Sequence, residues 1–262
     1  MTLTPLWTSE QVASVLATEI KDRWDCQGIS IDSRTVEEGD LFFALIGPNS
    51  DGHDYVKMAI AKGAVAAVVS KPVKGLDPKF LVMVEDVKQA LEDLGRAARA
   101  RVDIPIIAIT GSVGKTGTKE ALKNALSRSR KVHASILSYN NDIGVPLSLA
   151  RMPRDADYGI FELGMNHAGE LRQLSKMVRP HVALITTVEL AHSEFFKDVE
   201  AIADAKAEIF EGLEPKGTAI LNYDNPHYDR LCDKATKAGV GNIISFGLDD
   251  EADVHALRQV FH

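Results

Sequence analysis

Residues 106–120 read IIAITGSVGKTGTKE: an apolar run leads into a turn with two glycines, followed by Lys-Thr and a polar segment. The apolar run predicts a buried strand, and the segment that starts at Lys-Thr predicts a helix. This order is typical of a phosphate-binding loop, because glycines let the backbone approach the anion and the first helical amides point at it. We therefore expect residues 111–117 to bind the phosphates of a nucleotide.

The residue types in this loop suit a nucleoside triphosphate. Lys115 would supply a positive charge to the β- and γ-phosphates, and the Thr116 hydroxyl would bind the Mg²⁺ that bridges them. Residue 109 is Ile, so the loop matches the short pattern GxxGK[ST] and not GxxxxGK[ST]. The alternative is a glycine-rich turn that only caps a helix. If the loop binds ATP, the contacting residues are Gly111, Ser112, Val113, Gly114, Lys115, Thr116 and Gly117.

The rest of the chain predicts two α/β domains. From residue 104 onward, apolar runs alternate with helical patterns, as in a parallel sheet with crossover helices. We expect a small N-terminal α/β domain over 1–101 and a mostly parallel-sheet, phosphate-loop domain over 102–262. The strands expected in the first domain are 28–31, 40–46, 64–69 and 80–84. Those expected in the second are 104–109, 132–137, 158–163, 182–187, 218–222 and 243–246, with helices over 115–127, 169–178, 199–213 and 228–238.

Composition excludes several classes of protein. Of 262 residues, 45% are hydrophobic and 26% charged, as in ordinary globular proteins. A net charge of −7 argues against a nucleic-acid-binding protein, which needs clustered Lys and Arg. Cys26 and Cys232 form no CxxC pair, so we expect neither a disulfide framework nor a cysteine zinc site. Because no signal-like start and no run of about 18 apolar residues is present, we expect a cytoplasmic protein without stable membrane insertion.

Two polar residues lie at or just after the carboxyl ends of predicted strands. Ligands bind outside these strand ends in open α/β sheets. Glu162 lies near the end of an apolar strand, and a carboxylate there needs a cationic partner. Mg²⁺ beside Thr116 would be such a partner, and a salt bridge inside the scaffold is the alternative. His192 follows the strand that ends near Thr187, so it is a candidate metal ligand or only a polar surface group.

Lys206 interrupts the apolar face of a predicted helix. The spacing of three, four, three and four residues places it on one stripe with Val199, Ile202, Ile209 and Leu213. Its stem could pack while its ammonium reaches water. Alternatively, a desolvated amine loses its proton readily and could react with CO₂ to form a carbamate, which is a metal ligand.

Several ordered segments resemble the Mur ligases of peptidoglycan synthesis. They are TGSVGKTGTKE (110–120), SYNNDIGVPLSL (138–149), FELGMNHAGEL (161–171), TTVELAHSEFF (186–196), ADAKAEIFEGL (203–213) and AILNYDN (219–225). The stretch IDSRTVEEGDLFFALIGPNSDGHDYV (31–56) is similar to the UDP-binding domain of that family. The resemblance implies an ATP- and Mg²⁺-dependent ligase, acting as a monomer, that couples a carboxylate to an amine through an acyl phosphate.

The resemblance also implies roles for individual residues. Thr116 and Glu162 would bind one Mg²⁺, and His192 a second one. Lys206 aligns with the lysine that is carbamylated in several Mur ligases, and would act with Lys115 and His192 in catalysis. The remaining assignments are Asn222 and Asp224 near ATP, Asn140 and Asn141 near the substrate, and Ser33 and Arg34 on the uridine side.

Within the family, the likeness is to ligases that add D-alanyl-D-alanine to UDP-N-acetylmuramoyl-tripeptide. The alternatives are relatives that add the third amino acid, folylpolyglutamate synthase, and a non-catalytic module that binds a nucleotide or a UDP-sugar. Two departures stand out: Ile46 replaces the lysine of the usual ALKG, and Gly117 replaces Thr or Ser. Because the motifs of the family's third domain are absent, we expect a fragment or truncated form with a partly built site.

Overall fold

The computed structural model describes residues 4–136, 139–190 and 195–256. It divides into two compact units, one of residues 1–102 with 149–154 and the other of residues 103–148 with 155–262. The predicted α/β class is confirmed, because both units are built on parallel sheets. Within the described ranges, no helix is both long and apolar enough to cross a membrane.

The first unit contains a four-stranded parallel sheet in the order β3-β4-β5-β6 and a small antiparallel pair, β1-β2. One part of its core lies between the sheet and α2, where Phe42, Val56 and Val69 are buried, and Leu91 and Leu94 of α3 are also buried. The elements are β1 (Trp7–Thr8), α1 (Ser9–Leu16), β2 (Asp25–Cys26), β3 (Gly28–Ser30), β4 (Asp40–Phe43), the 3₁₀ turn η1 (Gly52–Tyr55), α2 (Val56–Ala61), β5 (Ala66–Val69), η2 (Pro78–Phe80), β6 (Leu81–Met83) and α3 (Val87–Ala100).

Residues 149–154 belong to this first unit although they lie far along the chain. The Trp7 indole donates to the Ala150 carbonyl at 2.9 Å, and Arg101 Nη2 donates to the Met152 carbonyl at 2.7 Å. Arg151 Nε donates to a carbonyl of β3 at 2.7 Å. Side chains thus donate to three backbone carbonyls, two in this segment and one in β3. A buried carbonyl without a hydrogen-bond partner is energetically costly.

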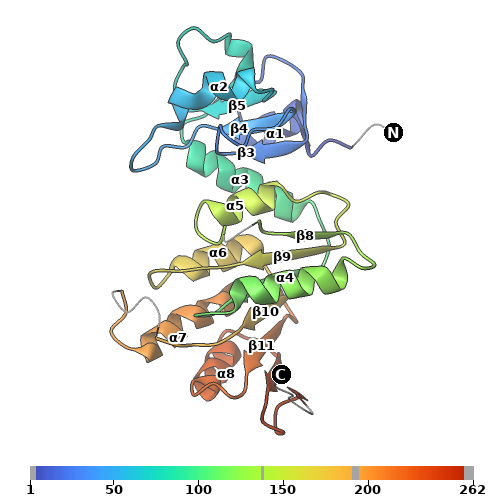
Figure 1. Cartoon of the computed structure of the whole chain (residues 1–262), viewed down its shortest axis with the longest axis vertical. Coiled ribbons are helices and arrows are strands. Elements are labelled where there is room, and N and C mark those ends of the chain that lie inside the picture. The colour runs from blue at the N-terminus through green and yellow to red at the C-terminus, as the bar shows by residue number, and fades with distance from the viewer. Residues whose placement is uncertain (1–3, 137–138, 191–194, 257–262) are drawn as a thin grey trace, which may run out of the picture. The chain divides into compact units, whose positions relative to one another are not determined.

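The second unit contains a parallel sheet of seven strands in the order β13-β12-β11-β10-β7-β9-β8. Helix α4 packs against β7, β8 and β9, and α8 packs against β11 (Figure 1). The elements are β7 (Ile106–Thr110), α4 (Lys115–Leu126), β8 (Val132–Ala134), α5 (Gly144–Ala150), β9 (Tyr158–Glu162), α6 (Glu170–Val178), β10 (Val182–Ile185), α7 (Val199–Ala207), the 3₁₀ turn η3 (Glu208–Gly212), β11 (Thr218–Asn222), α8 (Tyr228–Lys237), β12 (Asn242–Gly247) and β13 (Val254–His255).

The short strands β1, β2 and β13 were not predicted, and β4 ends at Phe43 where the sequence predicted a strand over 40–46. Two helical segments of the second unit also differ from the prediction. Helix α7 ends at Ala207 and continues as η3, where the sequence predicted one helix over 199–213. The Ser175 hydroxyl of α6 donates to the Ile209 carbonyl, so that carbonyl has a side-chain partner in the tight turn. Helix α5 was not predicted, because its seven residues are buried all round and show no helical period.

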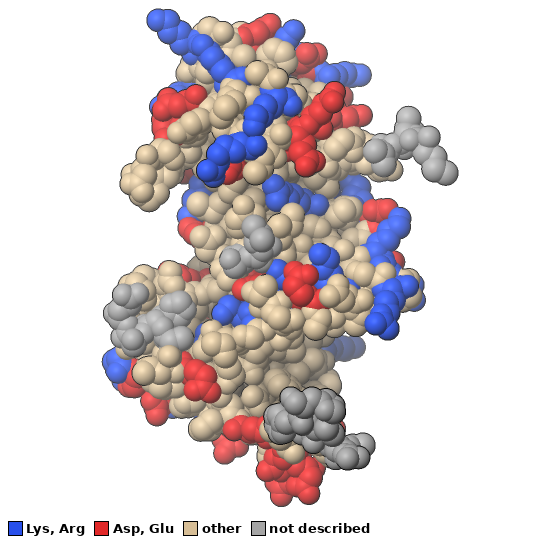
Figure 2. Space-filling view, viewed as in Figure 1, with Lys and Arg blue, Asp and Glu red and all other residues tan. Residues whose placement is uncertain are grey.

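Charged side chains are mixed over the surface. On the face that Figure 2 shows, Lys and Arg alternate with Asp and Glu over the described parts of both units, with no continuous basic area. A nucleic-acid-binding surface requires clustered positive charge.

Candidate active site

The site of interest lies at the carboxyl end of β7. Strand β7 lies between β9 and β10, and the chain passes from one side of it to the other after β9. Such a switch point in an open α/β sheet forms a crevice that binds ligands. The register pairs Ile109 with Glu162 and Thr110 with Ile185, so the ends of all three strands meet at this edge.

Two glycines shape the loop that leaves β7. Gly111 has a φ of 147° and Gly114 a φ of 86°, values that residues with a side chain rarely adopt. A Cβ atom on Gly111 would overlap the Thr186 hydroxyl. That hydroxyl donates to the Val113 carbonyl at 2.6 Å, and the Ser112 amide donates to the Thr187 carbonyl at 2.9 Å. The loop is therefore held against the end of β10.

The loop presents a row of free backbone donors. No described residue accepts a hydrogen bond from the amides of residues 113–117, which form the last part of the loop and the first turn of α4. Lys115 Nζ donates to the Gly111 carbonyl at 2.7 Å and to the Ser112 carbonyl at 3.4 Å. Consecutive free amides at a helix N-terminus, together with an ammonium, form a site for a phosphate group.

Burial lowers the pKa of Lys115, and the nearby charge of Glu162 raises it in part. The ammonium is thus partly desolvated within the loop. A partly desolvated cation interacts more strongly with an anion than one in bulk water. This environment is suited to an anionic ligand.

Glu162 is buried at the end of β9, with 1% of its surface exposed. Its Oε2 accepts from the Thr116 hydroxyl at 2.8 Å, and its Oε1 accepts from the Asn140 amide at 2.9 Å. Lys119 Nζ lies 3.9 Å from Oε2. The salt bridge inside the scaffold, one of the two alternatives left open by the sequence, is therefore present with Lys119 as the cation, and Glu162 also contacts Thr116.

The donor set at Glu162 fits Mg²⁺. The described residues contain no group of three or more His, Cys, Asp or Glu side chains that could hold a metal ion. Mg²⁺ does not need such a group, because it keeps several waters and binds through one or two carboxylates together with substrate phosphates. One carboxylate and one hydroxyl beside a phosphate loop are suited to that mode of binding.

Lys206 is buried in α7, with 2% of its surface exposed. Its ammonium makes no hydrogen bond or ion pair with any residue in the described ranges. Burial lowers its pKa to about 7, and the positive charge of Lys115 contributes to the shift. The ammonium does not reach water as the snorkelling alternative requires, and a large neutral fraction of the amine is available near neutral pH.

The residues after β11 reach the same edge of the sheet. Asn222 Nδ2 donates to the Thr186 carbonyl at 3.3 Å. The Asp224 carboxylate accepts from the amides of Leu248 and Asp249 at 2.7 and 3.1 Å, so it shapes the loop after β12. Asn225 was not singled out from the sequence, yet its side chain is buried and donates to the Val188 carbonyl at 3.0 Å.

The other predicted site residues perform local roles or belong to the first unit. The Asn141 side chain accepts from the Gly144 amide at the start of α5. Ser33 is buried in the first unit, and Arg34 is exposed there with its Nη2 2.6 Å from Asp32. His192 lies outside the described residues.

The comparison with known proteins identifies the family. The profile described as "Mur ligase middle domain" matches residues 109–262, and the one described as "Mur ligase family, catalytic domain" matches residues 25–108. The chain belongs to the Mur ligase family. The resemblance found in the sequence is thereby confirmed at the level of the family.

Individual Mur ligases match over most of the chain. A protein of Rickettsia prowazekii named UDP-N-acetylmuramoyl-tripeptide--D-alanyl-D-alanine ligase is 41% identical over 94% of this chain and 55% of its own length. A crystal structure of MurF from Acinetobacter baumannii matches with a TM-score of 0.83 and 34% identity, over 98% of this chain and 56% of that one. MurF from Thermotoga maritima, solved with ADP, matches with a TM-score of 0.70 and 29% identity, over 85% of this chain and 50% of that one. The chain thus spans about half the length of these relatives.

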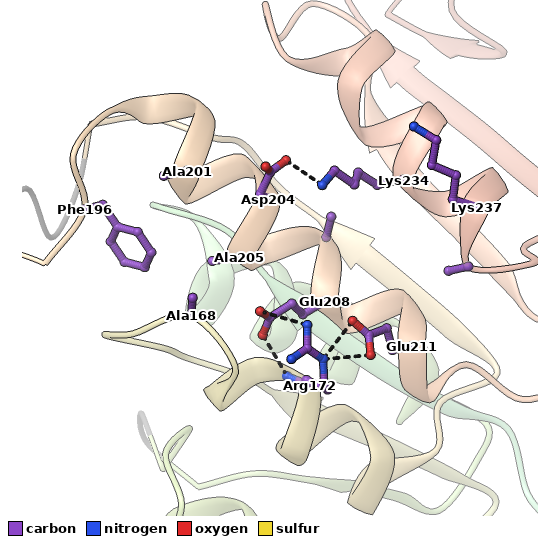
Figure 3. A pocket seen from close by; sticks show the side chains of 12 residues that line it. Ala168, Arg172, Phe196, Ala201, Asp204, Ala205, Glu208, Glu211, Lys234 and Lys237 are labelled. Atoms are coloured by element: carbon purple, nitrogen blue, oxygen red, sulfur yellow. Dashed lines mark hydrogen bonds and ion pairs between the residues drawn. The ribbon is translucent and has the colours of Figure 1, made fainter.

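A separate cavity of about 510 Å³ in this Mur ligase lies among α6, η3, α7 and α8 (Figure 3). Glu208 is at its base, where its carboxylate accepts from the Gly169 amide at 2.8 and 2.9 Å and from the Arg172 amide at 3.2 Å. Gly169 has no side chain to cap α6, so Glu208 caps that helix from η3. The cavity lining includes none of the predicted nucleotide-binding residues.

We expect Glu208→Ala to lower the free energy of unfolding by about 1–2 kcal/mol, because it leaves two partly buried amides at the N-terminus of α6 without an acceptor. The matched control is Glu211→Ala, which removes a more exposed carboxylate that also pairs with Arg172. That change should cost less than about 1 kcal/mol. Urea denaturation of both variants measures the difference, and equal losses would show that the cap has no special role.

Proposed function

We propose that this chain carries the nucleotide site of an ATP-dependent ligase that adds D-alanyl-D-alanine to UDP-N-acetylmuramoyl-tripeptide, in the synthesis of peptidoglycan precursors. The observation that carries the proposal is the row of free amides over 113–117 beside Lys115 and the Thr116–Glu162 pair. The names of relatives at 32–41% identity support the choice of substrates.

The proposed reaction brings two anions together, since the terminal carboxylate of the peptide must attack the γ-phosphate of ATP. Lys115 and the loop amides would bind the phosphates and offset their charge. Thr116 and Glu162 would hold Mg²⁺, which neutralises further charge on the phosphates. Asn140 would hold the Glu162 carboxylate in place, as its 2.9 Å hydrogen bond does here.

Lys206 and His192 complete the proposed catalytic group. The amine of Lys206 is buried and its pKa is lowered to about 7, which favours the neutral form that reacts with CO₂. We propose that the resulting carbamate, together with His192, binds a second metal ion. Asn222 and Asp224 would lie near the nucleotide, and Asn141 near the peptide. Ser33 and Arg34 would contact the uridine side of the substrate. We propose that the protein acts in the cytoplasm.

The decisive experiment measures phosphate release by the purified protein with ATP, UDP-N-acetylmuramoyl-tripeptide and D-alanyl-D-alanine. We expect release that requires all three compounds, because the amine is needed to discharge the acyl phosphate. Omission of each compound in turn provides the controls. Phosphate release that is unaffected by the amine would contradict the proposal and favour a hydrolase or a kinase.

A second candidate is a non-catalytic module that binds a nucleotide or a UDP-sugar. It is favoured by one observation, that the free amides of residues 113–117 suit phosphate binding whether or not a transfer step follows. Binding of ATP and of UDP-N-acetylmuramoyl-tripeptide without any phosphate release would support this candidate over the ligase.

A further inference from the structure

Lys119 is a buried cation that the sequence analysis did not single out. It lies on α4 one turn after Lys115, and its side chain is fully buried. Its Nζ donates to the Ser135 carbonyl at 2.8 Å and lies 3.9 Å from Glu162 Oε2 and 3.3 Å from Glu120 Oε1. A buried ammonium needs such partners, because leaving water is costly for a charge.

Lys119 is the paired cation of the Glu162 carboxylate among the described side chains. Its remaining side-chain contacts, the Thr116 hydroxyl and the Asn140 amide, are neutral. Among the described residues, Lys119 is the cation within 4.0 Å of this carboxylate. Glu120 is half-exposed and already has Lys123 at 3.9 Å. The buried pair is therefore formed by Lys119 and Glu162.

We propose that Lys119 is a resident counter-ion of Glu162, which neutralises and positions this carboxylate when no metal is bound and weakens the affinity of the site for a divalent cation. The inference rests on the proposed function, in which Glu162 binds Mg²⁺. A dication at Glu162 experiences the positive charge of Lys119 in a low-dielectric environment, where like charges repel strongly. The lysine acts through Glu162 and is a positioning residue.

The proposal predicts that loss of the Lys119 charge lowers the stability of the metal-free protein and raises its affinity for a dication. Lys119→Met and Lys119→Gln should lower the stability of the metal-free protein, since each leaves a buried carboxylate without its cation. The same variants should bind a dication about tenfold more tightly, because the repulsion is removed. A purely structural lysine would produce the first effect without the second. Lys119→Gln keeps a donor for the Ser135 carbonyl and separates loss of charge from loss of that hydrogen bond.

The test uses Mn²⁺ as the probe and electron paramagnetic resonance of the free ion at pH 8 to measure its dissociation constant. Urea denaturation with and without Mn²⁺ gives the stability. The matched control is Lys123→Met, the same substitution one turn further along α4 on a half-exposed side chain. It should leave the Mn²⁺ affinity unchanged.

Glu162→Gln tests the metal site separately from the counter-ion role of Lys119. If this variant binds Mn²⁺ as tightly as the unchanged protein, the metal site itself is misassigned. If Glu162→Gln abolishes binding while both Lys119 variants bind Mn²⁺ with unchanged or lower affinity, the counter-ion role is wrong and the metal site stands. Should a Lys119 variant unfold without metal, refolding on addition of Mn²⁺ supports the proposal and failure to refold overturns it.

Discussion

Replacement of Lys115 by alanine is expected to weaken ATP binding by at least about 30-fold, since truncating one partner of a buried charge pair costs about 2–5 kcal/mol. The ammonium already lies at the loop, donating to the Gly111 carbonyl at 2.7 Å, so a bound phosphate only has to replace a neutral partner. Equilibrium binding of ATP to the purified protein, measured by calorimetry in the presence of Mg²⁺, gives the change directly.

The control for this variant is Lys123→Ala on the same helix. Lys123 is half-exposed and, among the described residues, pairs with Glu120 at 3.9 Å, so its loss should change the ATP affinity by less than about twofold. An affinity of the Lys115 variant equal to that of this control would remove the phosphate-loop assignment. Unchanged circular dichroism of both variants would show that the fold is retained.

Lys206→Met is expected to stabilise the protein at pH 7 and below, by an amount that disappears at alkaline pH. The free amine of lysine has a pKa near 10.4 in an unfolded chain, whereas burial lowers the pKa of Lys206 to about 7 in the folded state. Below about pH 7 the folded protein must bury the charged ammonium, so the full desolvation cost lowers the free energy of unfolding. Methionine has a similar shape and carries no charge.

The pH dependence provides the test of this expectation. Between about pH 7 and pH 10 the unfolded chain holds a proton that the folded chain has lost, so stability rises with pH by up to about 1.4 kcal/mol per unit from this group. The difference in free energy of unfolding between Lys206→Met and the unchanged protein should shrink across that window. Denaturation in CO₂-free buffers avoids carbamate formation. A difference that does not vary with pH would show that Lys206 remains solvated.

The sequence predicted the part of the site that depends on the order of the elements. Strand β7, its glycine-containing loop and α4 follow one another directly, so local spacing was enough to place Lys115 and Thr116. Glu162 could be placed near Thr116 because parallel strands end at a common edge. The register of β7 with β9 confirms that neighbourhood.

Interactions between elements far apart in sequence could not be predicted in this way. Lys119 occurs in a polar helical segment and has the residue type of a surface position, and only the packing of α4 on β8 and β9 buries it. Glu208 caps α6 across 39 residues of sequence. In both cases tertiary packing determines which groups the side chain contacts. The local sequence pattern does not show that packing.

The return of residues 149–154 to the first unit makes the chain pass between the units three times, near residues 102, 148 and 154. No single cut therefore separates the two units cleanly. Cleavage after residue 102 leaves residues 149–154 on the second piece, and cleavage near residue 148 or 154 leaves residues 1–102 joined to part of the second unit. A piece that starts at residue 103 would carry Leu149, Ala150 and Met152, all fully buried here, without the Trp7 and Arg101 side chains that bond to this segment. Exchange of either half with a homologue must move this hexapeptide together with the N-terminal portion.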